Sequence, residues 1–319
     1  TSIQSDDLCS ARPEQHRALL KHIQALCASG KIRLRYSEQL YVPDLARELE
    51  ALTWIPELGK PGDHFHVSAI KIIGDGSLGA RTAHLRQGYR DDPGNHGIAF
   101  YDQPTLDEMV ARAHERGVAV AINAIGDGAV DSALTAIERA RLKNPAPVRH
   151  GLVHCQITDR ALLSRFAQAG ALAFTQPVFL DYDSHIVRER VGNELAETSY
   201  AFHTYIKMGV CEAFGTDCPV EDFDPMPGLY CAVSRRDLKG EGPYLPDEAM
   251  GMQKAVACYT ASGAYASGEE AFKGRIRAGM LADFVLMDRD ILRLPVEECL
   301  QAQVDATYVG GERLYTRIQ

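Results

Sequence analysis

Residues 69–79 read Ala-Ile-Lys-Ile-Ile-Gly-Asp-Gly-Ser-Leu-Gly, a short β-branched run that ends in a glycine-rich turn. A run that is apolar on both faces is typical of a buried strand in a parallel sheet. Lys71 interrupts this run, and an amine between isoleucines is costly unless its charge is paired, removed or used. Lys71 could also extend its amine from an edge strand, or pair with a buried carboxylate such as Asp75.

Similar apolar runs alternate with amphipathic stretches through the first 270 residues. Strands are expected at 1–4, 32–36, 67–73, 118–122, 152–154, 171–175 and 210–215. Helices are expected at 105–116, 128–142, 159–169, 199–208 and 248–259, several of them followed by glycine. This alternation predicts a parallel α/β sheet, but seven strands are one fewer than a closed (β/α)8 barrel requires. We therefore expect a TIM-type barrel that lacks its first strand, in a chain that is part of a longer polypeptide.

The pattern changes after residue 270. Short strands are predicted at 275–279, 282–287, 306–311 and 312–315, with Gly310-Gly311 as a hairpin turn. We accordingly divide the chain into an incomplete barrel at 1–270 and a small β appendage at 271–319.

Composition excludes several classes of function. The chain has 319 residues, of which 45% are hydrophobic, and a net charge of -9 that offers no basic surface to nucleic acid. Its 8 cysteines are dispersed without a CxxC pair, as expected for free thiols in a reducing compartment, so we expect a cytoplasmic protein. No secretory leader opens the chain and no apolar run approaches the ~18 residues of a membrane helix, so no membrane partner is expected.

Polar residues that end apolar runs are the candidates for chemistry, because a parallel barrel gathers its active site at the carboxyl ends of its strands. Four positions qualify: Lys71, Asn123, His154 and Asp217. His154 could bind a metal or be a satisfied core histidine, and Asp217 could be a ligand, a general base or a helix N-cap. Asn123 is a weaker ligand for a transition metal than histidine would be.

Four motifs occur in the same order along the chain. They are Ile70 to Thr82, Ala124-Ile125-Gly126-Asp127, Val153-His154-Cys155-Gln156 and Gly215-Thr216-Asp217-Cys218-Pro219-Val220. Together they resemble amidohydrolase family 3, the YtcJ-like branch of the metal-dependent hydrolases. Residues 274–288 and 309–311 look like the C-terminal part of that superfamily's composite β-sandwich, so the resemblance places residues 271–319 in that sandwich.

The resemblance implies hydrolysis of carbon–nitrogen bonds, in amides or cyclic amides, by a metal-activated water. It implies a divalent metal, zinc being the expected ion, with one or two ions in the complete protein. Lys71 would be a carboxylated, metal-bridging lysine, His154 a ligand, and Asp217 a ligand or the general base. A small amide-like molecule would be the substrate, and homo-oligomerisation is an expectation from the family alone.

The chain departs from the family at two places. Asn123 stands where the family has histidine, so that ligand position is degraded, and the HxH pair of the first barrel strand has no counterpart. We therefore expect weak or no activity from the chain as given. The alternative function is a non-catalytic binding or regulatory protein that has lost its metal site. Arg81, Tyr182 and His185 fall on loops where they would contact substrate or simply lie at the surface.

Overall fold

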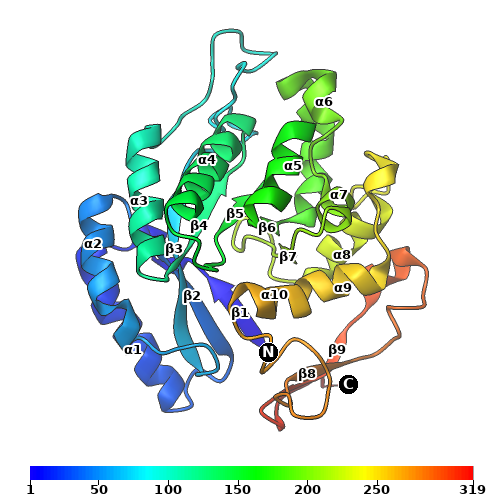
Figure 1. The fold of residues 1–319 in the computed structure, drawn as a ribbon. Helices are drawn as coiled ribbons and strands as arrows, with labels where there is room; N and C mark the ends of the chain where they lie inside the picture. The colour runs from blue at the N-terminus through cyan, green and yellow to red at the C-terminus, as the bar shows by residue number, and fades with distance from the viewer. Residues whose placement is uncertain (319) are drawn as a thin grey trace.

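The computed structural model describes residues 1–318, which build a curled, seven-stranded parallel sheet inside a layer of helices (Figure 1). The strands follow one another in space as in the chain: β1 (Ser2–Ser5), β2 (Arg35–Tyr41), β3 (Phe65–Ile73), β4 (Ala119–Ala124), β5 (Gly151–His154), β6 (Leu172–Thr175) and β7 (Glu212–Phe214). The predicted number of strands is confirmed. β1 and β7 are the two edges, and within residues 1–318 they do not pair with each other.

The prediction for β2, a strand at 32–36, is wrong, because the strand runs over Arg35–Tyr41. Its residues Ser37, Glu38 and Gln39 are buried although they are polar, so the strand carries no apolar run. Ile32, which suggested a strand, lies in the turn that follows α1. The apolar criterion detects strands whose two faces are both apolar and fails for one with polar residues directed inward.

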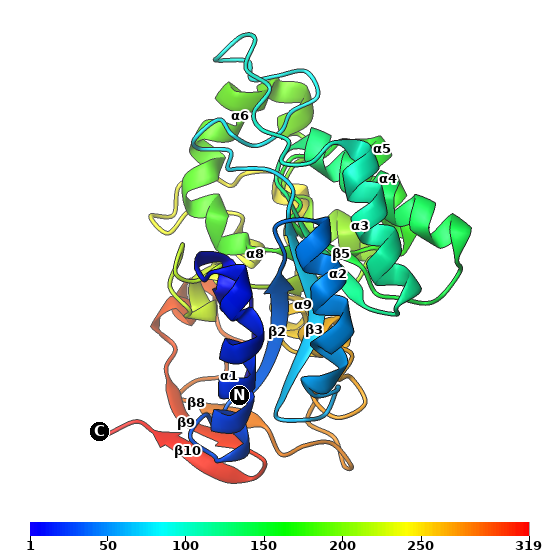
Figure 2. The same cartoon turned by 90° about the vertical axis from the view of Figure 1, so that its left-hand side faces the viewer.

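Helices cover the outer face of the sheet and its carboxyl edge (Figures 1 and 2). They are α1 (His16–Ala28), α2 (Leu45–Trp54), α3 (Gln103–Glu115), α4 (Asp127–Lys143), α5 (Arg160–Ala169), α6 (Leu180–Ala196), α7 (Phe202–Lys207), α8 (Pro225–Ser234), α9 (Met252–Tyr259) and α10 (Ala261–Ala266). Asp44, Asp102 and Asp159 begin α2, α3 and α5 by accepting a backbone N–H three residues on, a cap worth about 1 kcal/mol each. No helix in the described part of the chain is both long and apolar enough to cross a bilayer.

The alternation of side chains along the strands divides the core in two. On β3, Ile70 and Ile72 join the large cluster that packs against the helices. Ala69 belongs instead to a small cluster with Ala121 and Val153 of the neighbouring strands. Lys71 is two residues beyond Ala69, on the same side of the strand. On the inner face of the sheet Lys71 therefore lies next to this small cluster, against which Ala119 and Phe174 also pack.

A second, antiparallel sheet of order β10-β9-β8 follows the barrel. Its strands are β8 (Phe284–Met287), β9 (Val304–Val309) and β10 (Glu312–Thr316). Gly310 and Gly311 both have positive φ, 60° and 81°, as a two-residue type I′ turn requires, so the predicted hairpin is confirmed. The strand predicted at 275–279 is wrong, because Gly279 has φ 89° and the Met280 N–H donates to the Arg277 carbonyl in a turn.

One ion pair fastens this sheet to the barrel. Arg35, at the start of β2, donates Nε and Nη2 to the Asp283 carboxylate at 2.5 and 3.1 Å. The two side chains are only 10% and 4% exposed. Figure 2 shows the same neighbourhood, with the N-terminus beside β8 and β10. The domain division at residue 270 stays a prediction.

Candidate active site at the carboxyl edge of the sheet

Three of the predicted residues influence one another electrostatically. Lys71 lies near the end of β3, His154 ends β5, and Asp217 follows β7. Burial, and after it the Lys71 amine, lower the pKa of His154 to about 3. Burial raises the pKa of Asp217 to about 6, and Lys71 opposes that rise. The lysine charge thus acts on both other groups, which places all three in one region at the carboxyl edge of the sheet.

Lys71 pairs with Asp6, not with Asp75. Its side chain is 6% exposed, and Nζ lies 2.5 Å from Asp6 Oδ2. Asp6 directly follows β1, so it occupies a strand-end position equivalent to those of the other candidates. Asp6 was not among the predicted site residues, although it satisfies the strand-end criterion at β1.

The Asp75 carboxylate accepts hydrogen bonds from backbone amides and does not pair with Lys71. It accepts the N–H groups of His84, Ile125 and Gly126 at 3.0, 3.0 and 2.8 Å. Burial raises its pKa to about 6, against the opposing effect of these hydrogen bonds. Asp75 therefore joins the loop after β3 to the loop after β4, and it also receives the side-chain amide of Asn123 at 3.2 Å.

His154 faces two amide oxygens. Its Nδ1 lies 2.9 Å from Gln176 Oε1 and its Nε2 lies 2.6 Å from Asn123 Oδ1. The amide orientations follow from other bonds: Asn123 Nδ2 donates to Asp75, and Gln176 Nε2 donates to the Phe174 carbonyl at 3.3 Å. A neutral imidazole has one N–H, so it can donate to only one of these two oxygens. The lone pair of the other ring nitrogen then points at the lone pairs of the second amide oxygen.

Two facing acceptors repel each other unless a proton or a cation lies between them, so the ring has one acceptor contact that its single N–H cannot satisfy. Imidazole nitrogen, amide oxygen and carboxylate oxygen all bind divalent ions, and the second imidazole nitrogen is held by an acceptor, as is usual for a histidine ligand. The His154 and Asn123 side chains therefore fit a divalent ion, and Asp217, which is influenced by the same lysine charge as His154, is the candidate third donor.

The backbone at two of these positions is strained. His154 and Asp217 have φ of 77° and 59°, and Cys155 has φ of 52°. Left-handed conformations cost non-glycine residues free energy and are concentrated at functional sites, where the surrounding structure holds them.

The predicted substrate contacts are dispersed. Arg81 donates Nη2 to Asp91 at 2.7 Å, and Arg190 also pairs with Asp91. Tyr182 is 62% exposed on α6. His185, also on α6, lies 2.9 Å from Asp237. Each stays a prediction as a substrate contact. His185, Asp237 and Glu241 are also the one group of three or more His, Cys, Asp or Glu side chains within metal-binding distance in the part of the chain described.

Comparison with known proteins agrees with the geometry. A model of the amidohydrolase family matches residues 1–315. The Bacillus subtilis (strain 168) protein named "Putative amidohydrolase YtcJ" is 33% identical over 258 residues, 80% of this chain and 48% of that protein. The N-substituted formamide deformylase of Arthrobacter pascens is 28% identical over 222 residues, 69% of this chain and 41% of that enzyme. This chain thus spans about half the length of the curated relatives that it matches.

A solved structure shares the fold. The crystal structure of an uncharacterized metal-dependent hydrolase from Pyrococcus furiosus has a TM-score of 0.73 and 28% sequence identity to this chain. The match covers 92% of this chain and 56% of that one.

Proposed function

Because the chain belongs to the amidohydrolase family, we propose that it forms the catalytic barrel of a metal-dependent hydrolase that cleaves carbon–nitrogen bonds in small amides or cyclic amides, with zinc as the metal. The observation that carries the proposal is the His154 ring between two amide oxygens, Asn123 Oδ1 at 2.6 Å and Gln176 Oε1 at 2.9 Å, only one of which can receive its N–H. The half-buried Asp217 is influenced by the same lysine charge as His154. The formamide deformylase relative supports a C–N substrate, and formamides belong among the first compounds to test.

Each side chain of the proposed site has its own role. A divalent ion, when bound, lowers the pKa of a water ligand and polarises a carbonyl. Asp217, with a pKa of about 6, accepts a proton from the attacking water and donates it to the leaving nitrogen, a task for which a pKa near neutrality is suitable. Gln176 holds the His154 ring through Nδ1, and Asp75 holds the Asn123 amide. Lys71 supplies positive charge beside Asp217, balanced by Asp6.

Metal content and turnover test this proposal. Protein purified without chelators should contain at least about one equivalent of divalent metal per chain. A panel of N-acyl amines, cyclic amides and formamides should show chelator-sensitive turnover, assayed on the longest available polypeptide that includes this chain. Asp217→Asn should lower turnover by ~100-fold or more, the scale of general base catalysis.

Asp222→Asn is the matched control, because Asp222 lies exposed on the same loop. Its turnover should equal that of the wild type. Equal turnover in Asp217→Asn would refute the role of Asp217, and metal-independent turnover would refute the proposed chemistry.

The non-catalytic alternative rests on Asn123. If the protein holds less than about one metal equivalent and Asn123→His restores occupancy, the wild-type barrel is a binding protein that has lost its ion. If Asn123→His leaves an already full site unchanged, the amide oxygen is itself an adequate ligand.

A further inference from the structure

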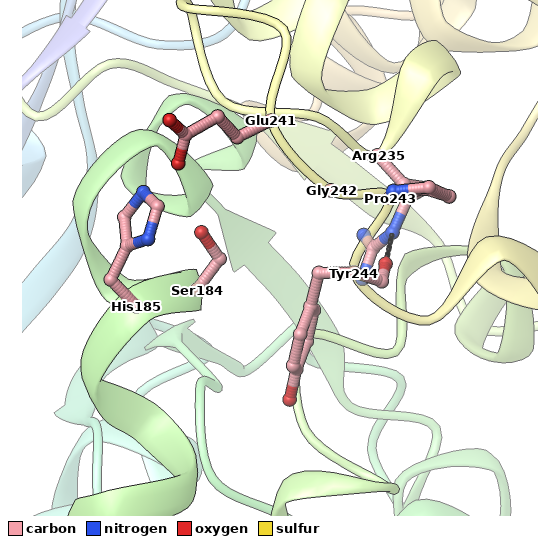
Figure 3. Close-up of a pocket in the computed structure, with 7 residues that line it drawn as sticks. All are labelled: Ser184, His185, Arg235, Glu241, Gly242, Pro243 and Tyr244. Carbon is pink, nitrogen blue, oxygen red and sulfur yellow. Dashed lines mark hydrogen bonds between the residues drawn. The ribbon is translucent and has the colours of Figure 1, made fainter.

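A second group of metal-binding side chains lies away from Lys71, His154 and Asp217. Helix α6 and the loop that follows α8 enclose a pocket of about 240 Å³ (Figure 3). Its lining residues are Ser184, His185, Arg235, Glu241, Gly242, Pro243 and Tyr244. In Figure 3 the His185 ring and the Glu241 carboxylate approach each other from the helix and the loop.

Three donor atoms converge beside this pocket. His185 Nε2 is 2.9 Å from Asp237 Oδ2, and one donor atom from each of His185, Asp237 and Glu241 lies within 4.8 Å of the other two. With zinc bonds of about 2.0–2.2 Å, a tetrahedral ion needs its donors roughly 3.3 Å apart. The His185–Asp237 separation is about 0.4 Å below that value, and no pair exceeds it by more than about 1.5 Å, so side-chain adjustments of this size would suffice.

The loop holds the Asp237 carboxylate in place before any ion arrives. Asp237 Oδ1 accepts the Lys239 and Glu241 N–H groups at 3.0 and 2.7 Å, which leaves Oδ2 for His185. The Leu238 N–H donates to Asp181 Oδ1 at 2.7 Å, and this bond attaches the loop to the first turn of α6. Such preorganisation reduces the entropy lost on binding.

Charge and exposure also suit a cation. The Asp237 side chain is 2% exposed. Although burial favours its neutral form, hydrogen bonds from the Glu241 amide and His185 hold the pKa of Asp237 below its ordinary value. His185 is 49% exposed, and Glu241 is exposed. The group therefore combines a fixed buried anion with two donors that an ion can reach from solvent.

We propose that His185, Asp237 and Glu241 form a binding site for a divalent transition metal, with zinc as the ion to test. One imidazole and two carboxylates make a three-donor set that leaves the fourth position open toward the pocket. A bound ion would connect α6 to the loop after α8. The site is independent of the proposed hydrolase chemistry, since it shares no residue with it.

Calorimetric titration of the metal-free chain with ZnSO4, together with zinc-edge anomalous diffraction from soaked crystals, tests the site. The wild type should show an anomalous peak between His185 and Glu241. His185→Ala and Glu241→Gln should each weaken binding of this ion at least 10-fold, because losing even an outer hydrogen-bond partner of a ligand costs ~10 to 100-fold.

His22→Ala and Glu194→Gln are matched controls, since both residues are exposed on other helical surfaces of the chain. Both should bind zinc as the wild type does. The proposal is overturned if no anomalous peak lies at this position, or if the two site variants titrate like the controls. A peak near His154 alone would support the proposed active site and still overturn this inference.

Discussion

Glu48 on α2 provides a test of how burial acts on charge in this fold. The residue is 0% exposed, and neither carboxylate oxygen accepts a hydrogen bond from any described residue. Burial raises its pKa to about 8, while Arg112 lowers it and Glu108 raises it further. We predict that Glu48→Met, which has similar length and no charge, stabilises the protein at neutral pH.

The magnitude follows from proton linkage. The pKa of the carboxyl is near its ordinary value of 4.5 in the unfolded chain and about 8 in the folded one, so the folded state binds more protons between these values. The free energy of unfolding therefore falls as the pH rises through this window. From pH 4.5 to pH 7 the loss is 2.5 pH units at 1.36 kcal/mol each, or about 3 kcal/mol. Glu48→Met has no carboxyl at this position and does not lose this stability. The difference between its free energy of unfolding and that of the wild type should therefore grow by about 3 kcal/mol from pH 4.5 to pH 7.

Urea denaturation at pH 4.5 and pH 7 measures the effect. Trp54, the single tryptophan of the chain, is buried at the end of the same helix and reports its unfolding by fluorescence, with circular dichroism as the global probe. Glu50→Met is the control, because Glu50 is exposed on α2. Parallel pH profiles for the wild type and Glu48→Met would refute the reasoning, since they would mean that Glu48 is ionised in the folded protein.

Two further predictions concern buried polar contacts. Arg35→Ala should cost about 3–5 kcal/mol in urea denaturation because it leaves Asp283 buried without its partner, whereas Arg33→Ala, in an exposed pair with Glu312, should cost less than about 1 kcal/mol; equal losses would contradict this. His150 has its pKa lowered to about 3 by burial and by His114, so its contribution is complete above pH 6.5 and falls as the pH drops toward 3. His150→Ala should therefore lower the free energy of unfolding at pH 7 and reduce the stability that is lost between pH 6.5 and pH 4. A pH profile of stability identical in shape to that of the wild type would contradict this prediction.

The parallel sheet could be predicted where its strands are apolar on both faces. Residues 67–73 and 118–122 agree closely with β3 and β4, and Gly310-Gly311 forms the expected turn. β2 could not be placed this way, because four of its six buried side chains, those of Arg35, Ser37, Glu38 and Gln39, are polar. The sequence alone also does not distinguish the turn at 275–279 from a strand, since the decisive feature is the positive φ of Gly279.

The strand-end positions of the candidate residues could also be predicted from the sequence, because they depend on the same strands. Strand-end position identified Lys71, His154 and Asp217, because a parallel sheet presents all its carboxyl ends at one edge. Asp6 and Gln176 were missed, since their roles depend on contacts 65 and 22 residues away in the chain. Asp75 was named as a partner for Lys71, but backbone amides of two loops bind it first.

The contacts of Asp75 change how Asn123 should be interpreted. An asparagine in place of a histidine would ordinarily indicate a lost ligand, because a free amide can rotate and present either end. Here Asp75 accepts the Asn123 nitrogen, so the amide oxygen is directed at His154 Nε2. Asp75 is in turn held by loops after two different strands. The orientation of Asn123 is therefore determined by the loops at the carboxyl edge of the sheet, and the residue that departs from the family presents an oxygen donor at the proposed ligand position.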